Sequence, residues 1–259
     1  MSNSTISVAS AKLYIKEYLE LPLAALHKEG ENILHTTFAL VRKAGACDLP
    51  NQVLAKALGG LRKYGAHTSI PLTRILELQG FDATLWCLRC VLPGEEAARD
   101  RLARLLVCVY AEHVAYLWVP PAGVTWRPED AISVARRYAL GQATDEELGK
   151  ARKSAESAAW VREAGQSDAV TAAALAGEAA QNTTWAGKED IVLFTARVAV
   201  SARARVGVAE VAAEFGLEVD SLSWYRYECK LKAGAVEREW QTEQLRRMLD
   251  GTEPTSVIS

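Results

Sequence analysis

The sequence lacks the features that mark several protein classes. Its 259 residues contain no stretch near the roughly 18 consecutive apolar residues of a membrane-spanning helix. The first residues show no basic start, apolar run and small-residue cleavage site, so we expect no signal peptide. The five cysteines are an odd number in a chain that is long enough to need no disulfides. Together these absences predict free thiols and a cytoplasmic protein.

Neither sign of charge is in large excess. There are 30 lysines and arginines against 32 acidic residues, for a net charge of −2. This balance argues against a protein coated in nucleic acid and against an acidic imitation of DNA, but it leaves a local patch of either sign open. The hydrophobic fraction of 49% is enough for a sizeable core, and 17 glycines and 8 prolines are ordinary numbers. Composition therefore predicts a soluble globular protein.

The short motifs of common enzymes are absent. The chain contains no HExxH, no GxSxG, no GxxxxGK[ST] and no GxGxxG after a strand. The acidic pairs at 95–96 and 146–147 fall in first turns of expected helices, where capping and the helix dipole already explain them. We predict a protein that is not an enzyme, with no catalytic residue and no cofactor. A helical enzyme with an unrecognised site is kept as an alternative.

Apolar residues recur at helical spacing along most of the chain, and strand signals are thin. A capping box of Thr144 and Glu147 opens one of the expected helices, and Gly80 ends another. The helical ranges are 10–20, 30–44, 50–61, 69–79, 82–93, 95–118, 127–141, a helix from 144, an alanine-rich part over 150–186, 188–204, 207–215, 220–232 and 234–250. This pattern predicts an all-α protein, a multi-helix bundle of antiparallel helical hairpins.

The last expected helix, 234–250, is amphipathic. Its apolar side carries Val236, Trp240, Leu245 and Leu249, and we expect Glu237 to lie on a mixed-sign surface with its charged neighbours. The helix is therefore predicted to dock on the body of the protein by that apolar side.

Cys87 and Cys90 form a C-x-x-C pair, a spacing that can ligate zinc or exchange thiols. Cys108 and His113, five residues apart on the next helix, are the nearest candidates for two further ligands. The alternative is that Cys87 and Cys90 lie on one apolar helix face, where a buried cysteine behaves as a small hydrophobe. We favour this alternative and predict no metal site.

Residues 207–228 resemble a helix-turn-helix. Ala212 permits a close helix crossing, Gly216 makes the turn, and Trp224 anchors the second helix. Glu218 argues against DNA binding, because it would face the DNA phosphates at a position where DNA-binding proteins carry basic or amide side chains. A tight hairpin in any helical protein gives the same pattern. If the segment does bind DNA, the predicted contact residues are Arg203, Arg205, Ser223, Arg226 and Lys230.

Four segments carry a wider pattern: GFDATLWCLRCV (80–91), RLARLLVCVYAEHVAYL (101–117), RPEDAISVARRYALGQATDEEL (127–148) and EREWQTEQLRRML (237–249). The positions that carry it are Gly80, Asp82, Trp86, Arg89, Ala111, Glu112, Val114, Arg127, Pro128, Arg136, Arg137, Arg238, Trp240, Gln241, Glu243, Leu245 and Arg246. Together the segments resemble a helical family described as immunity proteins of bacterial toxin systems, with relatives in phages and mobile elements. The resemblance implies a non-enzymatic α-helical protein that binds another macromolecule.

This resemblance covers residues 80–250, which we take as a helical core domain. Residues 1–79 form an N-terminal helical region and 251–259 a flexible tail. The leading hypothesis is a protein that neutralises a toxin, or a component of a bacterial defence system as an anti-CRISPR does, by occluding it. Tryptophan and arginine are frequent anchors of interfaces. The predicted partner-binding residues are Trp118, Trp126, Arg136 and Arg137.

Overall fold

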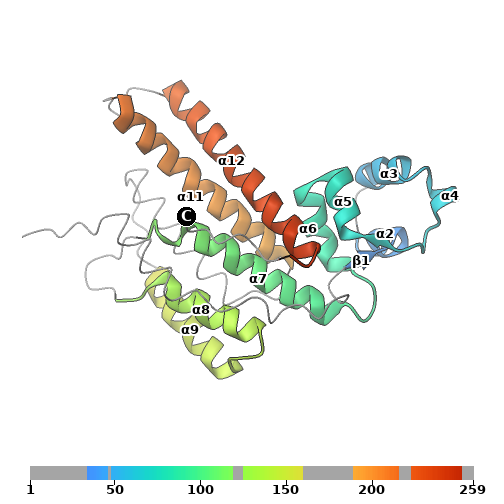
Figure 1. The fold of residues 1–259 in the computed structure, drawn as a ribbon, viewed down its shortest axis with the longest axis horizontal. Coiled ribbons are helices and arrows are strands. Elements are labelled where there is room, and N and C mark those ends of the chain that lie inside the picture. The colour runs from blue at the N-terminus through green and yellow to red at the C-terminus, as the bar shows by residue number, and fades with distance from the viewer. Residues whose placement is uncertain (1–33, 46–47, 119–124, 160–188, 216–222, 253–259) are drawn as a thin grey trace, which may run out of the picture.

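The computed structural model describes residues 34–45, 48–118, 125–159, 189–215 and 223–252 (Figure 1). Within these ranges the protein is all-α, as predicted, with ten α-helices and almost no strand. The elements are β1 (His35–Thr36), α2 (Phe38–Lys43), α3 (Asp48–Ala57), α4 (Leu61–Tyr64), β2 (Ile70–Pro71), α5 (Leu72–Gln79), α6 (Phe81–Cys87), a 3₁₀ turn at Leu88–Cys90, α7 (Glu96–Ala115), α8 (Pro128–Ala139), α9 (Asp145–Ala159), α11 (Glu189–Phe215) and α12 (Ser223–Leu249).

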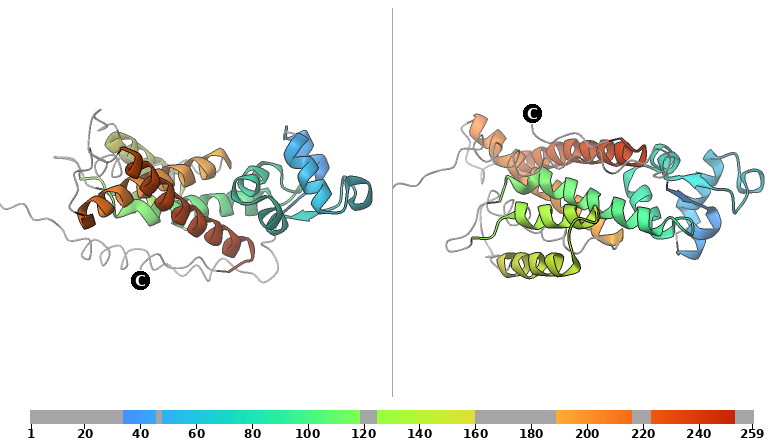
Figure 2. Two further views of the ribbon diagram at one scale, coloured as in Figure 1. Left: turned by 90° about the horizontal axis from the view of Figure 1, so that it is seen from above. Right: turned by 60° about the horizontal axis from the view of Figure 1, so that its bottom comes forward.

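Three long helices form the centre of the described part. Helices α11 and α12 pack along each other as an antiparallel pair, and α11 also packs on α7 (Figure 1). Helix α8 lies on α7 and α9 lies on α8, as the right-hand view of Figure 2 shows. The shorter elements from β1 to α5 gather at the opposite end from the tip of the α11–α12 hairpin (Figure 1). Part of the bundle is therefore built from antiparallel neighbours.

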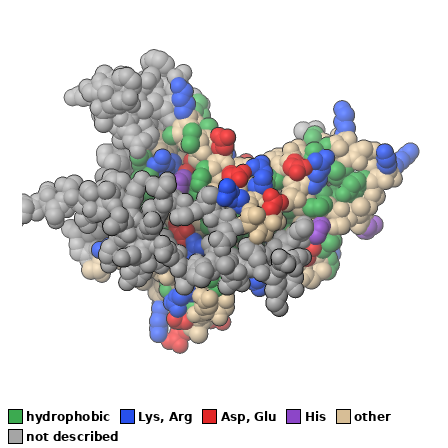
Figure 3. Space-filling model, viewed as in Figure 1, with side chains coloured by type: hydrophobic (Ala, Val, Ile, Leu, Met, Phe, Trp, Pro, Cys, Tyr) green, Lys and Arg blue, Asp and Glu red, His purple; other side chains and the backbone are tan. Residues whose placement is uncertain are grey.

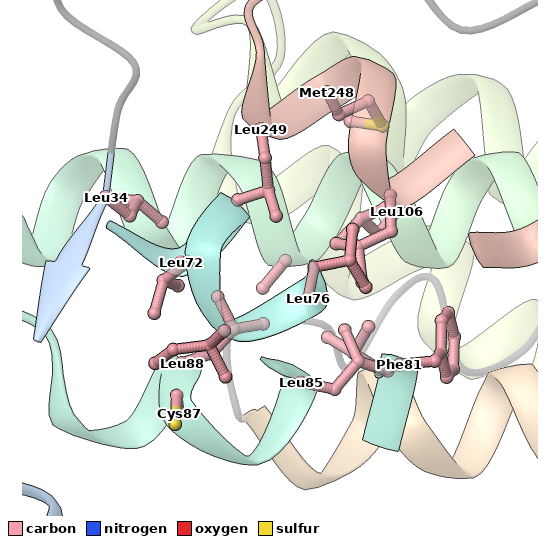
Figure 4. Close-up of a cluster of buried hydrophobic side chains, with 14 of the residues drawn as sticks. Leu34, Leu72, Leu76, Phe81, Leu85, Cys87, Leu88, Leu106, Met248 and Leu249 are labelled. Atoms are coloured by element: carbon pink, nitrogen blue, oxygen red, sulfur yellow. The ribbon is translucent and has the colours of Figure 1, made fainter. Parts of the chain in front are cut away.

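The apolar interior of the described part consists of two clusters. The first brings α5, α6 and the middle of α7 against the end of α12, where Leu76, Leu106 and Leu249 lie close together (Figure 4). It contains residues from both sides of position 79, and the division into domains stays a prediction. The second cluster joins the end of α7 to α8 and α11 and is rich in alanine, whose small side chain lets helices approach closely. Its alanines are Ala111, Ala115, Ala131, Ala135, Ala155, Ala199 and Ala202.

Part of the predicted helix 30–44 was wrong. His35–Thr36 pairs antiparallel with Ile70–Pro71, and helix α2 begins only at Phe38. The Thr37 hydroxyl accepts a hydrogen bond from the Leu40 N–H at 3.1 Å, which caps the helix. The Thr37 side chain therefore favours a helix that begins at Phe38 over one that begins before it.

The predicted breaks within the last two helices were also wrong. Among the described residues, one helix, α11 (Glu189–Phe215), replaces the two predicted as 188–204 and 207–215. One helix, α12 (Ser223–Leu249), replaces those predicted as 220–232 and 234–250, and each of the two has 27 residues. Gly234 lies inside α12 where a Cβ atom would come within 3.3 Å of Val200 Cγ1 on α11. The glycine therefore serves a close helix crossing rather than a helix end.

Two predicted helix boundaries are confirmed. The Thr144 N–H donates to Glu147 Oε2 at 2.8 Å and the Glu147 N–H donates to Thr144 Oγ1 at 3.2 Å, which is the predicted capping box at the start of α9. Gly80 ends α5 and precedes α6 with φ +80° and ψ −170°. That conformation is open almost only to glycine.

Candidate functional site

A group of polar and aromatic side chains is buried where α7, α11 and α12 meet; we call it the α7–α12 polar cluster. Its members are Tyr110, His113, Glu237, Trp240 and Gln241. His113 Nδ1 lies 2.8 Å from a Glu237 carboxylate oxygen, and only 2% of Glu237 is exposed. The Gln241 amide donates to the other Glu237 oxygen at 3.1 Å and to the backbone carbonyl of α11 at position 196 at 3.0 Å. One carboxylate oxygen therefore lies within ion-pair distance of the imidazole, and the other accepts a hydrogen bond from Gln241.

Aromatic rings cover the cluster. The Trp240 ring stacks on the His113 ring with 3.7 Å between centroids and 20° between planes. Tyr110 meets Trp240 edge to face at 6.4 Å, and its hydroxyl donates to the Gln241 backbone carbonyl at 3.4 Å. Burial raises the pKa of Tyr110 well above its usual range, so the phenol remains a neutral donor. This packing joins α7 to α12 by both polar and apolar contacts.

A histidine held by a carboxylate is the arrangement of a general acid–base pair. Here the partner carboxylate is buried and Trp240 covers one face of the imidazole, while 20% of the His113 side chain is exposed. A buried charge stabilises a fold only when its partners are in place, and the contacts to His113 and Gln241 provide them. These contacts therefore explain the pair as a junction between α7, α11 and α12.

This cluster was not predicted from the sequence. Glu237 was expected on a charged surface and is buried, whereas Val236 was expected on the apolar side and is 67% exposed. The buried stripe of α12 runs through Glu237, Gln241, Gln244, Leu245 and Met248. Gln241 and Gln244 each lie four residues before an apolar member, Leu245 and Met248, and this helical spacing is the one signal that could have indicated the stripe.

The structure packs two of the predicted partner-binding residues against each other. The Trp118 and Trp126 rings meet edge to face with 5.2 Å between centroids, and both contact the second apolar cluster. Trp126 is 8% exposed. Core packing therefore leaves Trp126 little surface for a partner.

The predicted arginine pair is divided between the interior and the surface. Arg136 is 4% exposed and its guanidinium bonds to the Glu112 carboxylate, with Nε 3.1 Å from Oε1. Burial is the largest single effect on the pKa of Arg136 and lowers it, but the charge of Glu112, the nearby Cys108 and the hydrogen bond to Glu112 together raise it above the usual value. Arg137 is one third exposed and lies 3.3 Å from a Glu147 oxygen. Arg136 is therefore engaged within the protein, and Arg137 is the more accessible of the two.

The residues of the DNA-binding alternative are described only in part. Arg203 on α11 hydrogen bonds to the Tyr116 hydroxyl and lies 5.9 Å from that ring, and Arg205 is half-buried. The connection between α11 and α12, and the side chains of Ser223, Arg226 and Lys230, lie outside the described residues. DNA binding by this segment stays a prediction.

The candidate zinc ligands lie in separate places. Cys87 and Cys90 belong to the first apolar cluster, where the Cys90 thiol donates to the Cys87 carbonyl at 3.3 Å. Cys108 belongs to the second cluster and His113 to the polar cluster. Across the described ranges, no group of three or more histidine, cysteine or acidic side chains is placed to hold a metal ion. The two cysteines therefore lie in the core, as the favoured alternative states.

The described helices define an all-α protein, and none of them is long and apolar enough to cross a membrane. Comparison with known proteins adds no class beyond this: no family model, no curated protein and no solved structure matches the chain. The resemblance to immunity proteins therefore depends on the sequence segments alone.

Proposed function

We propose that the protein is a non-enzymatic helical binding protein that neutralises a partner protein by occluding it, in the manner of an immunity protein or a phage-encoded inhibitor of a bacterial defence system. The observation that carries this proposal is the exposure of large apolar side chains on the α11–α12 hairpin. Phe194 on α11 is 47% exposed, and Leu231 and Val236 on α12 are 56% and 67% exposed.

These side chains are concentrated on one element. Four large apolar side chains are exposed among the described residues, and three of them belong to this hairpin; the fourth is Val53 on α3. Single exposed apolar residues are ordinary on a protein surface, and three of them on one hairpin favour this hairpin over the other described elements as the binding surface. In Figure 3, charged side chains of both signs lie beside apolar ones along the described part of the hairpin. Such mixed charge suits the polar rim of an interface.

The hairpin is also held firmly, which favours binding without a large loss of entropy. The contacts of His113 and Gln241 with Glu237 fix α12 to α7 and α11. Burial of an exposed apolar side chain in a protein–protein contact then gains free energy without rearrangement of the helices.

The experiment is an affinity capture from the lysate of the native host, with and without nuclease, read by mass spectrometry. We expect one protein partner that survives nuclease. Val236→Ser is expected to weaken its binding about tenfold, because roughly 1.5 kcal/mol of apolar burial is lost. Val53→Ser is the matched control, since this valine is 55% exposed on a different helix.

Two outcomes would contradict the proposal. Equal binding by the wild type and both valine variants would remove the hairpin as the binding surface. Loss of every captured protein after nuclease, together with strongly salt-dependent binding to duplex DNA, would favour the DNA-binding alternative.

A further inference from the structure

A pocket of about 460 Å³ lies between the first half of α7 and the end of α8, two helices that run side by side (Figure 2). Asp100, Arg101 and Arg104 line it from α7, and Tyr138 and Gly141 line it from α8 and the turn that follows. This volume is within the range of small-molecule sites in proteins. The pocket is separate from the hairpin surface of the proposed function.

Arg104 is the central cation of the pocket. Its guanidinium lies 4.7 Å from the centre of the Tyr138 ring, so the ring covers one face of the planar group. The Tyr138 hydroxyl donates to Asp145 at 2.6 Å, which holds the ring in place. Arg104 Nη1 is shielded from solvent and has no hydrogen-bond partner in the described part of the chain. A buried donor of this kind is costly unless a ligand or water binds it.

The other charges around Arg104 leave positive charge in excess. Arg101, one turn earlier on α7, is exposed and forms no ion pair within the described ranges. The one acidic side chain of the lining, Asp100, is already bound by Arg99 at 2.7–2.8 Å. Burial lowers the pKa of Arg104, and the nearby Arg152 lowers it slightly further. An anion in the pocket would offset both effects.

Backbone carbonyls at the end of a helix ordinarily disfavour an anion. In the last turn of α8 the carbonyl of Arg137 accepts the N–H groups of Leu140 and Gln142, and the carbonyl of Tyr138 accepts that of Gly141. These bonds turn the carbonyls toward their own chain. The carbonyls of Arg137 and Tyr138 are therefore occupied within their own chain, and the side chains of Arg101 and Arg104 supply the positive charge of the pocket.

We propose that this pocket binds an oxyanion, a phosphate or carboxylate group carried by a small molecule, through Arg104 and Arg101. Guanidinium groups bind both oxyanions through short, charge-assisted hydrogen bonds, and Arg104 is held ready by Tyr138. The proposal is independent of the partner-binding function.

The test is isothermal titration calorimetry of the full chain with pyrophosphate and, separately, with citrate, at constant ionic strength. We expect saturable binding of at least one of them. Arg104→Gln and Arg101→Gln are each expected to weaken binding about tenfold, the effect of one lost charge-assisted hydrogen bond. Arg74→Gln is the matched control, because it removes the same charge from an exposed arginine on α5 that pairs with Glu77. Circular dichroism checks that each variant is folded.

Binding of pyrophosphate alone supports a phosphate ligand, and binding of citrate alone supports a carboxylate ligand. Absence of saturable heat with both probes would overturn the proposal. The same conclusion would follow if Arg74→Gln weakened binding as much as Arg101→Gln, because the effect would then reflect net charge rather than this pocket. Arg101 is exposed, so its variant remains informative even if Arg104→Gln fails to fold.

Discussion

Replacement of Glu112 by leucine would leave the Arg136 guanidinium buried without its counter-charge. Arg136 is 4% exposed, the Glu112 side chain is 10% exposed, and the two groups meet through both Nε and Nη2 of the arginine. Removing one partner of a buried ion pair typically costs about 3–5 kcal/mol, mostly because the remaining charge cannot be rehydrated. Since domains unfold with about 5–15 kcal/mol, this loss would be a large part of the total stability.

The assay is urea unfolding followed by circular dichroism, with four variants compared. Glu112→Leu is expected to lose about 3–5 kcal/mol, while Glu112→Leu combined with Arg136→Met removes both charges and is expected to recover most of the loss. Glu243→Leu is the matched control, because Glu243 also pairs with arginines but does so at the surface. We expect it to change the stability little. Arg136→Met alone completes the double-mutant cycle.

Two results would refute this reasoning. If Glu112→Leu were no less stable than Glu243→Leu, the buried guanidinium would not need its partner. If the double variant were as unstable as Glu112→Leu, the loss would come from packing of the leucine rather than from the unpaired charge.

Two further predictions follow from single residues. Burial raises the pKa of the Cys108 thiol to about 12, so almost no thiolate exists at pH 8. Iodoacetamide should therefore alkylate Cys108 in denaturant but not in the folded protein, and modification of the folded protein would contradict this. Gly80→Ala is expected to lower the free energy of unfolding by about 1–3 kcal/mol, because alanine disfavours φ +80° with ψ −170° even though no atom would clash with its Cβ. Gly149→Ala is the control, since Gly149 lies inside α9 with open space around it, and this variant should not destabilise the protein.

Local signals in the sequence predicted the helices well. The capping box of Thr144 and Glu147 and the helix end at Gly80 depend on residues a few positions apart, so the sequence contains all the information that they need. The pairing of His35–Thr36 with Ile70–Pro71 joins residues far apart in the chain, and no local pattern indicates it.

Contacts between helices account for what the sequence did not predict. The predicted boundary between 232 and 234 was wrong, and Gly234 instead lies inside α12, where it closely approaches Val200 of the neighbouring helix. In the same way, Arg136 looked like a surface residue because its partner, Glu112, is 24 residues away on α7. A charged side chain whose partner is far away in the sequence is therefore predicted to lie at the surface even when the structure buries it.

The α7–α12 polar cluster fixes the register in which the central helices meet. A shift of α12 by one turn, about 5.4 Å, would take Glu237 away from His113 and leave a buried carboxylate without this partner. The polar cluster therefore opposes sliding of α12 along α7 and α11, because the contacts of Glu237 and Gln241 depend on the axial position of α12.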